Sequence, residues 1–289
     1  MTTRMLKKGF GLAVRLSRRH KARTALTQLT SHEHPKVKAV GHALHESLTN
    51  AMSAEEQELI RLIEERRSFL LRSDKEIPVI DYGAGRRDSN RTKEDMEKGE
   101  RSTALVASIC RGSKSAFWAT VLFKLIRKLE PSSCVELGAC VGISASYQAT
   151  ALSINRKGRL VTLEGSPEIA KIAEETLEGL NLRKVSVVTG PFHETLKGVL
   201  KSSKPIDFFF NDGHHDHDAV IGYFNEAMPN LSNEAVMVFD DISWSPGMRK
   251  VWTEIEDDER VTVSIDLHAM GIALIGSNLA TKEKFRIPL

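Results

Sequence analysis

Cysteine, aromatic residues and long apolar runs are all scarce in this sequence. Only 3 of the 289 residues are cysteine, and Phe, Trp and Tyr together make up 6%. Three cysteines without metal-type spacing argue against a disulfide framework and against a zinc site. No apolar run approaches the roughly 20 residues that a membrane-spanning helix needs. We therefore expect a globular, cytoplasmic protein without a transmembrane segment.

Positive charge is abundant only at the beginning of the chain. Residues 1–40 carry a formal charge of +9, while the whole chain carries +3, which leaves −6 for the remainder. Plotted as a helix, residues 4–19 place apolar side chains on one side and basic side chains on the other. Three interpretations are open: a helix that docks on the rest of the chain or on a dimer partner, a segment that binds an anionic membrane surface or nucleic acid, and a transit peptide or disordered segment.

Two further helices are predicted before the main domain, over residues 35–50 and 53–73. The second begins with a capping-box pattern, in which the side chains of Ser53 and Glu56 each accept a hydrogen bond from the other's backbone N–H. Residues 83–102 are rich in Gly, Arg, Asp and Ser and are interpreted as a loop. The expected division is a basic helical extension (1–82), a linker (83–103) and a main domain (104–289).

From residue 104 onward, helix and strand patterns alternate, which is typical of a parallel sheet covered by helices on both faces. The predicted fold is α/β, a Rossmann-like doubly wound sheet of seven strands whose last two strands are antiparallel, with an N-terminal helical extension. The predicted strands are 133–137, 159–163, 185–189, 206–210, 235–239, 261–265 and 271–275. The predicted helices are 113–129, 142–154, 167–180, 194–200, 218–231 and 246–255.

Two glycine segments compete as the nucleotide-binding loop. Residues 78–85 and 134–142 each resemble a short strand followed by an acid and glycines. Only the second leads into an apolar helix and then a strand that ends in an acid, Glu164, whose carboxylate can accept ribose hydroxyls. The first is interpreted as a loop, with closure over the site as a second interpretation. In the second segment Cys140 stands where dinucleotide enzymes have their middle glycine, which favours a ligand without a pyrophosphate.

The segment Val135-Glu-Leu-Gly-Ala-Cys-Val-Gly142 resembles the cofactor loop of class I S-adenosylmethionine-dependent methyltransferases, especially the catechol O-methyltransferase-like branch. Residues 162–167, 188–192, 206–215 and 238–242 resemble later motifs of that branch in the same order. The resemblance implies S-adenosylmethionine as cofactor. It implies cofactor contacts at Glu136, Gly138, Ala139, Gly142, Ser144, Glu164, Gly165, Ser166, Gly190, Phe192 and Asp212.

Three acids end the fourth and fifth strands of the predicted domain: Asp212, Asp240 and Asp241. Carboxylates gathered at one edge of a sheet repel one another unless a cation offsets them, and a hard divalent ion such as Mg²⁺ takes oxygen ligands. Related O-methyltransferases hold a metal at the corresponding positions, so the resemblance implies metal ligation by these three residues. The alternative is that some of them cap helices or contact the cofactor.

His215 follows Asp212 by three residues and is the preferred general base, with Asp212 beside it in the catalytic set. Histidine changes charge near neutral pH and can take a proton from an acceptor hydroxyl. The run His214-His215-Asp216-His217 offers competing candidates. Trp244, just after the fifth strand, is a candidate wall of the acceptor site.

The predicted function is methyl transfer from S-adenosylmethionine to a hydroxyl of a small-molecule acceptor, with a divalent metal as a candidate aid. Two alternatives are carried: an RNA or other nucleic-acid methyltransferase held by the basic N-terminus, and a non-catalytic cofactor-binding protein. The net acidic main domain weighs against nucleic acid. Further interpretations are a homodimer through the N-terminal helices and peripheral membrane contact by residues 4–19.

Overall fold

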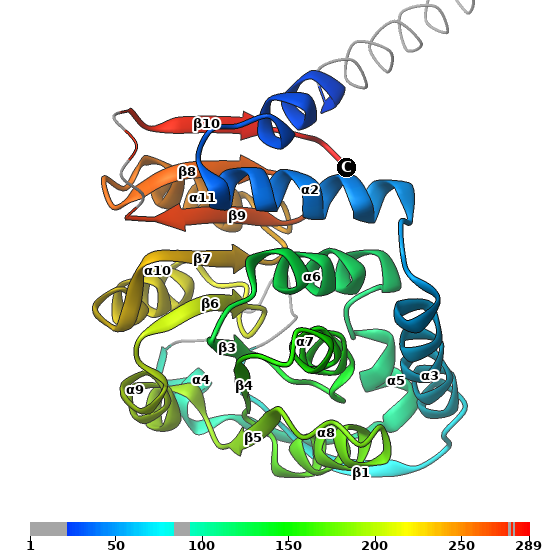
Figure 1. The fold of residues 1–289 in the computed structure, drawn as a ribbon. Helices are drawn as coiled ribbons and strands as arrows, with labels where there is room; N and C mark the ends of the chain where they lie inside the picture. The colour runs from blue at the N-terminus through cyan, green and yellow to red at the C-terminus, as the bar shows by residue number, and fades with distance from the viewer. Residues whose placement is uncertain (1–21, 84–92, 277–278, 280) are drawn as a thin grey trace, which may run out of the picture.

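The computed structural model describes residues 22–83, 93–276, 279 and 281–289 of the chain (Figure 1). The amphipathic segment 4–19 lies outside the described residues. The helices are α2 (Pro35–Thr49), α3 (Ala54–Leu71), α4 (Lys93–Lys98), α5 (Val106–Arg111), α6 (Ala116–Leu129), α7 (Ile143–Ile154), α8 (Pro167–Gly179), α9 (Phe192–Ser203), α10 (His217–Ala227) and α11 (Pro246–Asp257). The strands are β1 (Glu76–Asp81), β2 (Glu100–Leu105), β3 (Ser133–Leu137), β4 (Arg159–Glu164), β5 (Val185–Thr189), β6 (Ile206–Asn211), β7 (Leu231–Phe239), β8 (Val261–Asp266), β9 (Gly271–Ile275) and β10 (Glu283–Arg286).

The central sheet has the strand order β10-β8-β9-β7-β6-β3-β4-β5, which can be followed from top to bottom in Figure 1. Its strands are parallel except for β9, which is antiparallel to both β7 and β8. The predicted Rossmann-like fold and the antiparallel pairing of 261–265 with 271–275 are therefore confirmed. The predicted number of strands was wrong, because β10 adds an eighth strand, parallel to β8 at the edge of the sheet.

Side chains that alternate along each strand build two apolar layers. On β6, Phe208 and Phe210 pack into the core beneath α2, α3, α6, α7 and α8, while Phe209 packs into the core beneath α9, α10 and α11. All three phenylalanines are fully buried. This alternation follows from the two-residue period of a strand, and burial on both faces is characteristic of a parallel sheet.

The predicted loop at residues 83–102 needs correction. Within the described residues it contains α4 and the beginning of β2, and β2 pairs with β1 as an antiparallel two-stranded sheet. The side chains of β2 are almost all exposed, so the strand shows no apolar alternation in the sequence. Its partner β1 packs against α8, beneath the main sheet in Figure 1.

The predicted N-terminal helices are present and pack on the main domain. The predicted capping box of Ser53 and Glu56 is confirmed at the start of α3. Helix α2 packs against α6. The side chain of Lys124 on α6 is buried, and its ammonium lies 2.8 Å from Glu56 Oε2 and 3.2 Å from Glu46 Oε2. One buried lysine thus ties α2 and α3 to α6. Among the helices of the described residues, none combines the length and the apolar character needed to cross a membrane.

Strand β3 lies at the point where the order of the parallel strands reverses, with β4 on one side and β6 on the other. The chain leaves β3 at Gly138, β4 at Gly165, β6 at Asp212 and β7 at Asp240, all at the same edge of the sheet. Ligands of doubly wound sheets bind at this reversal, outside the carboxyl ends of the strands. The fold therefore brings the predicted site residues to one edge.

Candidate active site

A cavity of about 340 Å³ opens at this edge of the sheet. Its volume lies within the range of small-ligand pockets, and most of its lining is apolar with a few polar groups. The predicted site residues that line it are Gly138, Ala139, Ser144, Glu164, Gly165, Phe192, Asp212, His215 and Asp241. The cavity therefore joins the glycine loop after β3 to the acids and histidine after β6 and β7.

Gly138 allows the chain to turn sharply as it leaves β3. Its φ is +92°, and a Cβ atom there would lie 2.5 Å from the backbone oxygen of Asp212. The N–H groups of Gly138 and Ala139 both donate to the carbonyl of Leu163 at 3.0 Å. The glycine loop is thus bound to β4 and leaves no room for a side chain against β6.

Glu164 at the end of β4 faces the cavity, where the sequence placed a ribose-binding carboxylate. Its Oε2 accepts a hydrogen bond from the backbone N–H of Cys140 at 2.9 Å, and its Oε1 accepts one from the N–H of Ser166 at 3.0 Å. Burial raises the pKa of Glu164 to about 7, against the lowering effect of these hydrogen bonds. The carboxylate therefore titrates close to neutral pH in the ligand-free protein.

Four predicted cofactor residues lie outside the cavity lining. Glu136 is fully buried behind the glycine loop, where its carboxylate accepts hydrogen bonds from Thr162 and Gln148. The Oγ of Ser166 accepts a hydrogen bond from the N–H of Ile80 in β1 at 3.2 Å. Gly142 and Gly190 have φ of +85° and +136° and allow turns at the starts of α7 and α9. Contact of these four residues with the cofactor stays a prediction.

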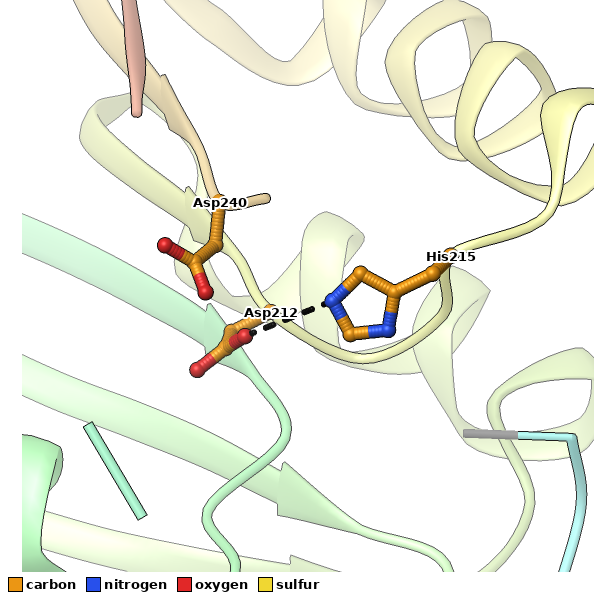
Figure 2. A group of neighbouring side chains, drawn as sticks. All are labelled: Asp212, His215 and Asp240. Carbon is orange, nitrogen blue, oxygen red and sulfur yellow. Dashed lines mark ion pairs between the residues drawn. The ribbon is translucent and has the colours of Figure 1, made fainter. Parts of the chain in front are cut away.

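The acids that follow β6 and β7 gather around His215. Figure 2 shows the side chains of Asp212, Asp240 and His215 pointing toward one another. Their ligand-type atoms lie within 4.8 Å of one another. His215 Nε2 lies 3.2 Å from Asp241 Oδ2 and 3.9 Å from Asp212 Oδ1. The group that comes together is therefore Asp212, Asp240 and His215, whereas the predicted group was Asp212, Asp240 and Asp241. Asp241 instead faces the ring of the group's histidine.

Lys114, which sequence reasoning missed, lies among these acids. Its Nζ is 3.3 Å from each carboxylate oxygen of Asp212 and also pairs with Asp240 Oδ2. Its side chain is 10% exposed and lines the cavity. Burial raises the pKa of Asp212, an effect that the Lys114 ammonium partly offsets. The sequence indicated only that the acids at the strand ends require a cation, and it did not identify Lys114 as that cation.

The three histidines of the run at 214–217 have different surroundings. His214 is buried, with Nε2 at 2.8 Å from the backbone oxygen of Tyr82 and Nδ1 at 2.7 Å from the Tyr223 hydroxyl. Burial lowers the pKa of His214. His217 lies outside the cavity and pairs with Asp218 and Glu254. His215 is the member of the run that faces the acids, and Trp244 packs beside its ring with centroids 5.7 Å apart.

The first glycine segment also contributes to the site. Val79, Ile80, Asp81 and Tyr82 line the cavity, and a Cβ atom on Gly165 would lie 2.7 Å from the Tyr82 ring. Residues 79–82 thus form part of the cavity wall, and closure of this segment over the site stays a prediction. Residues 84–85 of the segment lie outside the described residues.

Comparison with known proteins points to one class of domain. Residues 135–242 match the family model of a methyltransferase domain. The solved O-methyltransferase from Bacillus cereus, in complex with SAH, is 25% identical with a TM-score of 0.50, over 58% of this chain and 85% of that chain. An SAH-bound methyltransferase from Podospora anserina is 18% identical with a TM-score of 0.51, over 57% of this chain and 81% of that chain, and shows a shared fold. Comparison with curated protein sequences found no match.

Proposed function

This chain carries an S-adenosylmethionine-dependent methyltransferase domain, and from that premise we propose that it transfers the methyl group to a hydroxyl oxygen of a small-molecule acceptor. The supporting observation is the single cavity that joins Glu164 and the glycine loop to His215 and Asp212. The end with Glu164 and the glycine loop, here called the cofactor end, has the features of a nucleoside site. The end with His215 and Asp212, here called the acceptor end, has a proposed base beside acids. The Bacillus cereus enzyme, named as an O-methyltransferase, supports the choice of oxygen.

The cofactor end fits S-adenosylmethionine without a phosphate site. Gly138 lets the backbone approach a ligand closely, since a side chain there would collide with Asp212. The Glu164 carboxylate, held by two backbone N–H groups, would accept the ribose hydroxyls. Ala139, Ser144, Gly165 and Phe192 complete the wall in this proposal. When bound, S-adenosylmethionine supplies an activated methyl group, which the acceptor oxygen takes as the bond to sulfur breaks.

His215 is the proposed general base at the acceptor end. Its imidazole takes the hydroxyl proton while the oxygen forms its new bond to carbon, and Asp241 and Asp212 stabilise the resulting imidazolium from 3.2 and 3.9 Å. Positioning of the acceptor supplies much of the rate, because the methyl donor is already activated. No step in this proposal passes through a metal ion.

The acceptor, the location and the assembly stay predictions. We propose a small molecule as acceptor because the cavity of about 340 Å³ lies within the range of small-ligand pockets. We also propose a cytoplasmic location and a homodimer that forms through the N-terminal helices.

The test is a binding and transfer experiment on the full chain. Calorimetry should detect S-adenosylmethionine binding, and a radiolabelled methyl donor should label small molecules that carry hydroxyl groups. Matched compounds in which hydrogen replaces the hydroxyl are the negative controls for transfer to oxygen. Folded RNA tests the alternative that the acceptor is a nucleic acid. Label that appears in RNA and in none of the hydroxylated compounds would contradict the proposal, as would tight cofactor binding without transfer to any substrate.

A further inference from the structure

The gathered acids at the acceptor end already have a cation. The Lys114 ammonium pairs with Asp240 and lies 3.3 Å from both oxygens of Asp212. These are two of the three residues whose ligand-type atoms come together. Asp240 is almost completely buried, and Lys114 comes from the segment between α5 and α6, 98 positions before Asp212. The contact is therefore a product of the tertiary fold.

Lys114 is held in place by its neighbours in the chain. The hydroxyl of Ser113 lies 3.7 Å from the Cys140 sulfur, and that sulfur lies 3.6 Å from the carbonyl oxygen of Ile109 at the end of α5. The segment that carries Lys114 is thus packed against the glycine loop. The Lys114 side chain is only 10% exposed, so its ammonium pairs with the two acids in surroundings that are largely shielded from water.

A divalent metal does not fit this arrangement. An ion such as Mg²⁺ requires oxygen ligands at about 2.0–2.1 Å in near-octahedral geometry. Both carboxylate oxygens of Asp212 and Oδ2 of Asp240 are paired with Lys114, so an ion bound by them would lie in contact with an ammonium of like charge. His215 Nε2, the third ligand-type atom, faces Asp241 at 3.2 Å. The predicted metal site at Asp212, Asp240 and Asp241 conflicts with these contacts.

We propose that Lys114 takes the place of a divalent metal and that methyl transfer by this chain is independent of metal ions. An ammonium has three N–H donors. Two serve Asp212 and Asp240, and the third is available to the acceptor oxygen in the cavity that Lys114 lines. As the hydroxyl proton passes to His215, this N–H stabilises the negative charge that develops on the oxygen. The assignment rests on the proposed transfer to oxygen.

The experiment compares the wild-type chain with Lys114→Met, and uses Lys197→Met as a matched control at an exposed lysine of α9. Mn²⁺ binding is followed by electron paramagnetic resonance, without cofactor or acceptor. The wild type and the control should bind no Mn²⁺ at the acids, whereas Lys114→Met should gain one ion, because it leaves two carboxylates without a cation. In EDTA the wild type should keep its full kcat, and Lys114→Met should lose about 10²–10³-fold.

Four results would overturn the assignment: Mn²⁺ bound at the acids of the wild type, no gain of Mn²⁺ in Lys114→Met, loss of wild-type activity in EDTA with recovery on Mg²⁺, or full activity of Lys114→Met in EDTA. Lys114→Gln provides the same test should the Met variant melt early. Because Mn²⁺ binding needs no substrate, it decides the role of Lys114 separately. Failure of the wild type on every hydroxylated acceptor would contradict the proposed function alone.

Discussion

Glu164 and Asp212 line the same cavity, at the ends of β4 and β6, yet their carboxylates are held by different kinds of partner. Glu164 accepts hydrogen bonds from two backbone N–H groups, those of Cys140 and Ser166. Asp212 is paired with side chains, Lys114 and His215. In both cases burial raises the pKa of the carboxyl group.

The difference separates what the fold determines from what individual side chains determine. Backbone donors are positioned by the strands and loops, so no single side-chain substitution removes the partners of Glu164. The partners of Asp212 can each be removed by one substitution. We infer that the cofactor end is built into the fold, whereas the chemistry at the acceptor end depends on a few residues.

The largest expected effect is at the acceptor end. His215→Ala should lower kcat by about 10²–10⁴-fold, because it removes the proposed base, while the affinity for S-adenosylmethionine changes little. Steady-state kinetics and calorimetry measure the two quantities. His217→Ala is the matched control, two positions along and paired with Glu254 outside the cavity. Equal losses in the two variants would remove His215 from the mechanism.

At the cofactor end, Gly138→Ala tests whether the backbone itself forms the site. A non-glycine residue at a φ of +92° costs about 1–3 kcal/mol, and the added Cβ would lie 2.5 Å from the Asp212 oxygen. We expect a lower melting temperature and an S-adenosylmethionine Kd raised by about 10–100-fold.

The control for Gly138→Ala is Gly198→Ala on α9, where no atom lies within 4 Å of the added Cβ. That substitution should stabilise the chain by about 0.5–1 kcal/mol, because alanine favours a helix. Unchanged cofactor affinity in Gly138→Ala would show that the loop can relax, and the proposed distinction between the two ends would not hold.

The smallest effect is a pH dependence of cofactor binding. The ribose hydroxyls favour ionised Glu164, whose pKa in the free protein is raised to about 7. Binding should therefore be strongest above about pH 8 and weaken as the pH falls through 7, by about tenfold at pH 6, where about one-tenth of the group is ionised. Calorimetry between pH 6 and 8.5 measures this change.

Two variants identify the titrating group. Glu164→Gln should bind more weakly and with no dependence on pH. Glu136→Gln should keep the dependence, although burial also raises the pKa of Glu136 to about 7, because Glu136 lies behind the loop. A pH dependence that disappears in Glu136→Gln and persists in Glu164→Gln would reverse the assignment.

Elements with a strong apolar period were predictable. The strands at 133–137 and 185–189 agree with β3 and β5 residue for residue. The predicted helix at 218–231 was too long at its C-terminal end, since α10 ends at Ala227 and Leu231 already belongs to β7. β2 and β10 were missed because their sequences, Glu-Arg-Ser-Thr-Ala-Leu and Glu-Lys-Phe-Arg, are mostly polar and lack the apolar alternation that identifies a strand.

The sequence by itself determined the order of strands and helices from β3 to β9, the glycine loop after β3, and the presence of acids and a histidine at the strand ends. These features depend on the regular spacing of apolar residues along the chain and on motifs whose residues are close together in the sequence. Only the tertiary structure decided that Lys114 lies between Asp212 and Asp240, that Asp241 faces His215, and that Tyr82 covers Gly165. These contacts join distant segments, and a charge in the sequence does not reveal which opposite charge the fold will bring to it.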